Sequence, residues 1–198
     1  MNPDADLSRP PALLVIDVQY GLDSPRLGVR NNPDAEKRIA DLLASWREAG
    51  RPVIHVQHMS TEPQSQLRPG LPGNAIKKEA LPIAGEALFQ KNVNSAFIGT
   101  GLEEYLRSKG IRSLVMVGLT TNHCISSSAR MAANLGFNVT IVADATAAHE
   151  QRSYDGTHYS GDTLHNAELA SLNGEFAAVR DSTDVLAEVS ESLPVRSG

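Results

Sequence analysis

Short, nearly continuous apolar runs alternate along this chain with segments whose apolar residues recur at helical spacing. The runs predict strands at 12–18, 52–59, 87–91, 114–117, 137–143 and 176–179. The helical spacing predicts helices from 32–34 to about Gly50 and at 100–109, 125–135, 163–172 and 183–193. Strands buried on both faces and alternating with helices are typical of a parallel sheet with right-handed crossovers. We therefore predict one α/β domain over residues 1–198.

Two polar segments interrupt this alternation. The stretch 60–82 is rich in Pro, Gly and Ser, and a loop of that length is usually functional, either as a lid over a site or as a surface that packs on a neighbouring subunit. After the fifth strand a second polar loop contains or adjoins His149, His158 and His165, which we expect to face solvent or an interface. Trp46 lies on the apolar stripe of the first helix and is expected in the core.

Composition limits the classes of partner. The formal net charge is −5 and the basic residues are scattered, so no face for nucleic acid is predicted. The single cysteine excludes an intrachain disulfide, and the first residues lack the features of a signal peptide. No apolar run approaches the roughly 20 residues that span a bilayer. The expectation is a cytoplasmic protein without a membrane partner.

The only cysteine, Cys124, lies between the strand 114–117 and the helix 125–135. At such a junction, free backbone N–H groups and the helix dipole favour a thiolate and can hold a developing oxyanion. A lone cysteine is also commonly a small buried apolar residue. Its position alone therefore leaves both interpretations open.

Two other reactive side chains are predicted at the same edge of the sheet. Asp17 ends the first strand and Lys91 the third, and ligands of open parallel sheets bind outside the carboxyl ends of strands. A carboxylate can take the proton of a thiol, and a lysine keeps that carboxylate ionised and supports the thiolate. Alternatively, Asp17 caps a loop or pairs structurally, and Lys91 is merely solvated. The shared location favours a catalytic set of Asp17, Lys91 and Cys124.

Four segments carry a family resemblance: ALLVIDVQ at 12–19, KNVNSAF at 91–97 followed by Gly99 and Thr100, GLTTNHC at 118–124, and ADAT at 143–146. In this order they resemble the isochorismatase-like cysteine hydrolases, a superfamily that includes nicotinamidases. The resemblance implies a three-layer, doubly wound, mainly parallel six-stranded sheet with helices on both faces. It also implies an Asp17, Lys91 and Cys124 triad in a homo-oligomer, either a dimer or a tetramer.

The same resemblance implies a mechanism. A cis peptide bond precedes Thr120, and the backbone N–H groups of Thr120 and Cys124 form an oxyanion hole. The Cys124 thiolate attacks an amide-type carbonyl of a small molecule, ammonia or an amine leaves, and water hydrolyses the thioester.

The chain departs from the nicotinamidase pattern after the second strand. The metal-binding Asp and His of nicotinamidases correspond here to His58 and Ser60, so neither a metal nor another cofactor is expected. His55 cannot readily join His58, because residues three apart on a strand point to opposite faces. His123 is expected to line the pocket or to touch a neighbouring residue rather than to form a dyad with Cys124.

Polar and aromatic residues next to the strand ends are candidates for substrate contacts. For each of them, the alternative is a structural role in its loop. The candidates are Gln19, Tyr20, Arg30, Asn31, Asn32, Asn94, Phe97, Asn122 and His123. An apolar wall with several amides and one arginine would suit a small polar or carboxylated amide.

Two other functions stay open at this stage. One is an isochorismatase-type hydrolase that cleaves a vinyl ether without a thioester. The other is a non-catalytic α/β ligand-binding module, which is disfavoured because the turn DVQYGLD after the first strand lacks the G-x-G-x-x-G pattern of dinucleotide sites.

Overall fold

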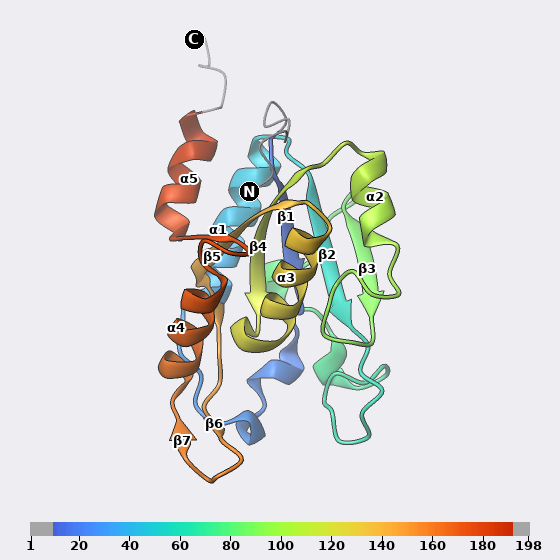
Figure 1. The fold of residues 1–198 in the computed structure, drawn as a ribbon. Coiled ribbons are helices and arrows are strands. Elements are labelled where there is room, and N and C mark those ends of the chain that lie inside the picture. The colour runs from blue at the N-terminus through green and yellow to red at the C-terminus, as the bar shows by residue number, and fades with distance from the viewer. Residues whose placement is uncertain (1–9, 192–198) are drawn as a thin grey trace.

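Six parallel strands form the central sheet of the computed structural model, which describes residues 10–191 (Figure 1). The order is β3-β2-β1-β4-β5-β8, so the chain winds outward from β1 in both directions. The strands are β1 (Ala12–Ile16), β2 (Val53–His58), β3 (Ala87–Lys91), β4 (Ser113–Leu119), β5 (Asn138–Ala147) and β8 (Ala178–Arg180). The predicted doubly wound parallel sheet is confirmed.

Helices cover both faces of the sheet. On one face lie α2 (Leu102–Ser108), α3 (Ser126–Asn134) and α4 (Gly161–Leu172), and on the other lie α1 (Ala35–Glu48) and α5 (Ser182–Glu191). Alternate residues of β1 enter the two cores: Leu14 and Ile16 pack with α2–α4, whereas Leu13 and Val15 pack with α1 and α5. Burial on both sides explains the apolar run of β1. Trp46 is fully buried in the second core, as predicted. No helix of residues 10–191 is both long and apolar enough to cross a bilayer.

The fifth strand is longer than its apolar run. A register shift between Met116 and Gly118 of β4 lets β5 continue to pair as far as Ala147, four residues beyond the predicted end at 143. Asp144 within this extension accepts hydrogen bonds from the backbone N and Oγ of Ser182, at 2.8 and 2.6 Å, at the start of α5. Asp144 therefore binds the start of α5, and β5 continues past it. The predicted end of the last helix, at 193, lies outside the described residues.

The polar loop after β5 contains structure that the sequence pattern did not predict. A two-stranded hairpin, β6 (Gln151–Arg152) and β7 (His158–Tyr159), projects at the foot of the view in Figure 1. His158 is partly exposed, but the expectation of solvent or interface positions is wrong for His149 and His165, which are 7% and 5% exposed. Their ring nitrogens bond to the Leu22 carbonyl oxygen and to Thr121 Oγ1, so both histidines belong to the scaffold.

The long loop 60–82 is attached to the strands beside it through its second half. Asn74 donates from Nδ2 to the carbonyl oxygens of His58 (2.8 Å) and Leu67 (2.6 Å), and its own carbonyl oxygen accepts from Gln19 Nε2 (2.8 Å). The backbone N–H of Lys77 donates to the Val18 carbonyl oxygen at 2.9 Å. This half of the loop is therefore part of the scaffold.

A partly buried ion cluster adds to this attachment. The side chain of Lys77 is only 4% exposed, and its Nζ contacts Asp23 Oδ1 and Glu36 Oε1 at 2.5 Å each. Arg30 donates hydrogen bonds to both carboxylate oxygens of Glu36, at 2.6 and 2.7 Å. Burial alone would raise the pKa of Glu36, but hydrogen bonds from Arg30 and Lys77 outweigh it and lower the pKa to about 2. The cluster joins the loop to the start of α1.

Gly118 is a position where the fold requires glycine. Its φ is +126°, and it pairs with Ile16 where β4 lies against the end of β1. A Cβ atom added here would overlap the Ile16 carbonyl oxygen far inside van der Waals contact. The close approach of the two strand ends therefore depends on a missing side chain.

We expect Gly118→Ala to lower the free energy of unfolding by about 3 kcal/mol or more, because it adds a backbone clash to an unfavourable φ. Gly136→Ala is the matched control. Its φ is +83° but its Cβ would meet nothing within 4 Å, so only the φ penalty of about 1 kcal/mol applies. Urea denaturation of both variants checks this, and equal losses would contradict the steric account.

We expect Glu36→Gln to make stability less sensitive to acid. The folded pKa of Glu36 lies below its ordinary value of 4.5, so its stabilising contribution is complete above pH 4.5 and is lost as the pH falls towards about 2. The urea midpoints of wild type and E36Q should therefore differ at neutral pH and converge near pH 2. E104Q, at an exposed position of α2, is the control and should follow the wild type throughout. A constant gap between wild type and E36Q would refute the assignment.

Candidate active site

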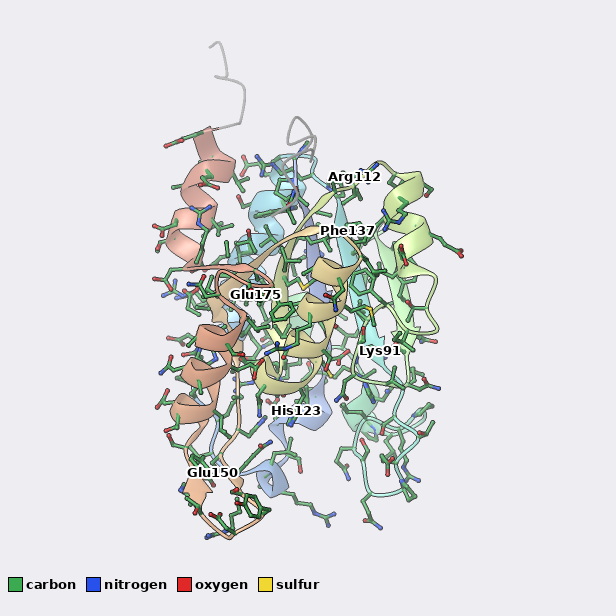
Figure 2. All side chains as sticks on the ribbon, viewed as in Figure 1. Lys91, Arg112, His123, Phe137, Glu150 and Glu175 are labelled. Carbon is green, nitrogen blue, oxygen red and sulfur yellow. The ribbon has the colours of Figure 1, made fainter. Side chains whose placement is uncertain are left out.

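Reactive side chains meet at the carboxyl edge of the sheet. Asp17 directly follows β1, His58 ends β2, Lys91 ends β3, and Cys124 lies in the turn after β4. Figure 2 shows Lys91 and His123 towards this edge, whereas Arg112 and Phe137 lie at the opposite end. Since all these strands are parallel, their ends bring residues from four separate segments together.

The turn that carries Cys124 has an unusual backbone. The peptide bond between Leu119 and Thr120 is cis, at the position that the resemblance implies. A single π-helical turn, Thr121–Ile125, follows, in which the Ile125 N–H donates to the Thr120 carbonyl oxygen at 3.2 Å, and α3 begins at Ser126. Cys124 is therefore half-buried in the turn just before the helix.

The Lys91 ammonium is the centre of the site. Its Nζ lies 2.6 Å from Asp17 Oδ2 and 3.3 Å from Cys124 Sγ, and also contacts His58 Nδ1 at 2.9 Å and the Val93 carbonyl oxygen at 3.1 Å. The Lys91 and Asp17 side chains are 0% and 1% exposed. The alternative of a merely solvated Lys91 is therefore wrong. The structure brings the three predicted residues into direct contact.

Burial is the largest influence on the pKa values of both acidic groups. It raises the pKa of Asp17, and the nearby charge of Lys91 with the hydrogen bonds from Cys124 and Lys91 only partly opposes this. Burial and the Asp17 carboxylate raise the pKa of the Cys124 thiol, against the opposing effect of Lys91. Burial thus favours the thiol over the thiolate and makes the Asp17 carboxylate a stronger base than an ordinary aspartate.

Asp17 has two further features typical of a functional residue. Its φ is +53°, a left-handed conformation that non-glycine residues rarely adopt. Its Oδ1 is buried and has no hydrogen-bond partner among the described residues. Buried carboxylate oxygens normally accept hydrogen bonds. Because Oδ1 of Asp17 accepts none from the described residues, it can still accept a proton or a hydrogen bond.

Asp17, His58 and Cys124 could in principle ligate a metal ion, because one ligand atom from each lies within 4.8 Å of the others. However, the Lys91 ammonium already contacts all three atoms and supplies a positive charge among them. A divalent cation would have to displace it. Ser60 donates its backbone N–H to the Leu67 carbonyl oxygen and accepts at Oγ from the Glu62 N–H, as a loop residue does. The set therefore fits an ammonium better than a metal.

Several residues expected to contact substrate are instead engaged in the scaffold. Gln19 is fully buried and its amide bonds to both backbone groups of His58, at 2.8 and 3.0 Å. Arg30 is held by Glu36, Asn31 Oδ1 accepts from the Ala148 N–H at 2.8 Å, and Asn32 donates to the Ala143 and Thr146 carbonyl oxygens. Phe97 packs in the core against Phe137, with ring centroids 5.9 Å apart. For these residues the alternative of a structural role is the one that the contacts support.

Other candidates lie nearer the sulfur. Asn94 Oδ1 is 3.9 Å from Cys124 Sγ, and Asn122 and His123 belong to the same turn as Cys124. His123 is exposed and contacts Thr120 Oγ1 at 3.0 Å through Nδ1, as expected for a histidine that touches a neighbour rather than forming a dyad with Cys124. Tyr20 is 45% exposed, and its hydroxyl accepts from the Lys78 N–H at 3.3 Å.

Two neighbours of the site were not predicted as such. Gln151, on the β6–β7 hairpin, contacts His123 Nε2 at 3.3 Å and Asn122 Nδ2 at 3.5 Å, so the hairpin braces the turn. No sequence signal marks it. The sequence indicates His58 only as the counterpart of a metal ligand, and its position beside Lys91 follows from the pairing of β2 with β3.

Comparisons with known proteins show the family to which this chain belongs. A model of the Isochorismatase domain matches residues 11–184. The isochorismatase family protein YrdC of Bacillus subtilis is 45% identical over 168 residues, 85% of this chain and 90% of YrdC. The maleamate amidohydrolase of Pseudomonas putida is 29% identical over 177 residues, 79% of this chain and 83% of that protein. The solved structure of an isochorismatase-family protein from Chromobacterium violaceum matches with a TM-score of 0.88 and 44% identity, over 91% of this chain and 94% of the other. This chain is thus a member of the isochorismatase family of hydrolases.

Proposed function

We propose that this protein is a cysteine-dependent amidohydrolase, which cleaves the C–N bond of a small amide through a thioester on Cys124. The observation that carries the proposal is the buried ammonium of Lys91, which bridges Asp17 Oδ2 and Cys124 Sγ. A thiol, a base and a cation in direct contact are the groups that covalent acyl transfer needs. A relative is a maleamate amidohydrolase, so amide hydrolysis occurs among similar proteins.

In the first half of the proposed reaction, Asp17 removes the proton of Cys124 as sulfur attacks the carbonyl carbon. The S–C bond forms while the carbonyl electrons move to oxygen. Backbone N–H groups of Thr120 and Cys124 are the proposed donors to that oxyanion. The raised pKa of Asp17 suits this step, because a stronger base takes the proton more readily.

In the second half, Asp17 gives the proton to the amide nitrogen as the C–N bond breaks, and ammonia or an amine leaves. Water then attacks the thioester and transfers a proton to Asp17. The S–C bond breaks, the carboxylic acid leaves, and the proton on Asp17 moves to sulfur, which restores the starting state. The Lys91 ammonium offsets the negative charge that moves between Asp17, sulfur and the oxyanion.

The side chains around Cys124 limit the class of amide that we propose as substrate. The sequence suggested a polar or carboxylated amide, with Arg30 as the cation for a carboxylate, but Arg30 is bound on both nitrogens by Glu36. The side chains near the sulfur that can still make contacts are the amides of Asn94 and Asn122, and the Oδ1 atom of Asn122 has no partner among the described residues. These favour a small neutral polar amide.

We expect Cys124→Ala to abolish hydrolysis. The assay is ammonia release from a panel of small amides that includes maleamate and nicotinamide, and the loss on any active amide should be about 10³-fold or more. His158→Ala, at the partly exposed β6–β7 hairpin, is the control and should keep the wild-type rate. An active C124A variant would rule out the proposal.

We also expect an acyl-enzyme. Acid quenching during turnover, followed by mass spectrometry of the intact chain, should show the acyl group on its single cysteine. Turnover of isochorismate without any adduct would instead support the vinyl ether alternative. No turnover of either class, together with thermal stabilisation by nucleotides, would support a ligand-binding module.

A further inference from the structure

The Lys91 ammonium has more acceptors than hydrogens. Four acceptors lie within reach of Nζ: Asp17 Oδ2 at 2.6 Å, His58 Nδ1 at 2.9 Å, the Val93 carbonyl oxygen at 3.1 Å and Cys124 Sγ at 3.3 Å. An ammonium carries three hydrogens. The four acceptors must therefore compete for these three hydrogens.

Hydrogen bonds to its backbone fix the position of His58. It is paired with Lys91 in the register of β2 and β3. Its backbone N–H donates to Gln19 Oε1 at 2.8 Å, and its carbonyl oxygen accepts from Gln19 Nε2 at 3.0 Å and from Asn74 Nδ2 at 2.8 Å. Both backbone groups are thus bonded to buried side chains, so the imidazole is presented to Lys91 from a rigid strand end.

His58 faces Lys91 as a neutral acceptor. Because Lys91 donates to Nδ1, the ring proton must be on Nε2. Burial and the charge of Lys91 lower the pKa of His58 to about 4, so the ring is neutral near pH 7. The other ionisable groups that face it are Asp17, whose Oδ2 is 3.9 Å from Nδ1, and Cys124 on the turn after β4. The ring therefore adds an acceptor to the site without adding a charge.

We propose that His58 is a positioning residue that competes with Cys124 for a hydrogen of the Lys91 ammonium, and so limits how strongly this ammonium stabilises the thiolate. When His58 and Asp17 each take one hydrogen, Val93 and the sulfur share the third. Without an acceptor at position 58, three acceptors remain for three hydrogens, and the sulfur receives a hydrogen bond of its own. A charge-assisted bond of this kind favours the thiolate over the thiol.

This inference deepens the proposed function and rests on it, because it assumes that the thiolate of Cys124 is the reacting form. The test needs no substrate. Cys124 is the only cysteine, so mass spectrometry of the chain after alkylation with iodoacetamide reports this thiol alone. The rate of alkylation at a fixed pH follows the thiolate fraction.

We expect His58→Phe, which keeps a ring but has no acceptor, to be alkylated about tenfold faster than wild type at about pH 8. This corresponds to a thiol pKa lower by about one unit, and the pH profile of alkylation should move by the same amount to lower pH. His58→Leu replaces it if H58F does not fold. An unchanged or slower rate in the folded apolar variant would overturn the proposal.

A conservative variant, His58→Asn, separates the effect of the hydrogen bond to Lys91 from the access of iodoacetamide to Cys124. His58→Asn places an amide oxygen near the position of Nδ1 and restores an acceptor for Lys91, so its alkylation rate should stay within about twofold of wild type. If easier access caused the acceleration, the smaller Asn would be alkylated at least as fast as Phe, and that result would also overturn the proposal. Loss of the proposed function would appear differently, as hydrolysis that survives Cys124→Ala.

Discussion

A lysine ammonium and an aspartate carboxylate, both sealed from solvent, form the contact on which the site depends. Taking two charges out of water carries a desolvation penalty of several kcal/mol per ion, which is offset only where geometry and additional hydrogen bonds are good. Lys91 meets this condition with four acceptors, whereas Asp17 has one oxygen bonded to Lys91 and the other without a partner. This asymmetry leaves the lysine saturated and the carboxylate still able to accept a proton. The pair is therefore suited to acid–base chemistry rather than to stability alone.

The surrounding scaffold keeps the strand ends at the separation that this contact requires. Gly118 lets β4 approach the end of β1, and Gln19 and Asn74 fix the end of β2. The second half of the 60–82 loop packs onto the exit of β1 through Lys77, whose ammonium is neutralised by Asp23 and Glu36. In this way a segment without long helices or strands contributes to the rigidity of the site.

The same contacts decide what the end of β2 contributes to the site. His58 is neutral and is hydrogen-bonded to Lys91, so this strand end supplies an acceptor for the ammonium without adding a charge. The two apolar cores are formed by other residues, and the imidazole of His58 therefore serves the site rather than the core.

The sequence by itself determined the features that depend on local pattern and on linear order. Apolar runs and helical spacing specified a parallel sheet, and the positions of Asp17, Lys91 and Cys124 after strands placed them at one edge, with the resemblance naming them as a set. Only the tertiary structure decided which partner each polar group takes. Arg30 is bound to Glu36, His149 and His165 are buried, β5 extends past its apolar run through a bulge, and His58 shares the ammonium of Lys91. These outcomes depend on contacts between segments far apart in the chain, where the nearest donor or acceptor decides, and no periodicity along the sequence records that distance.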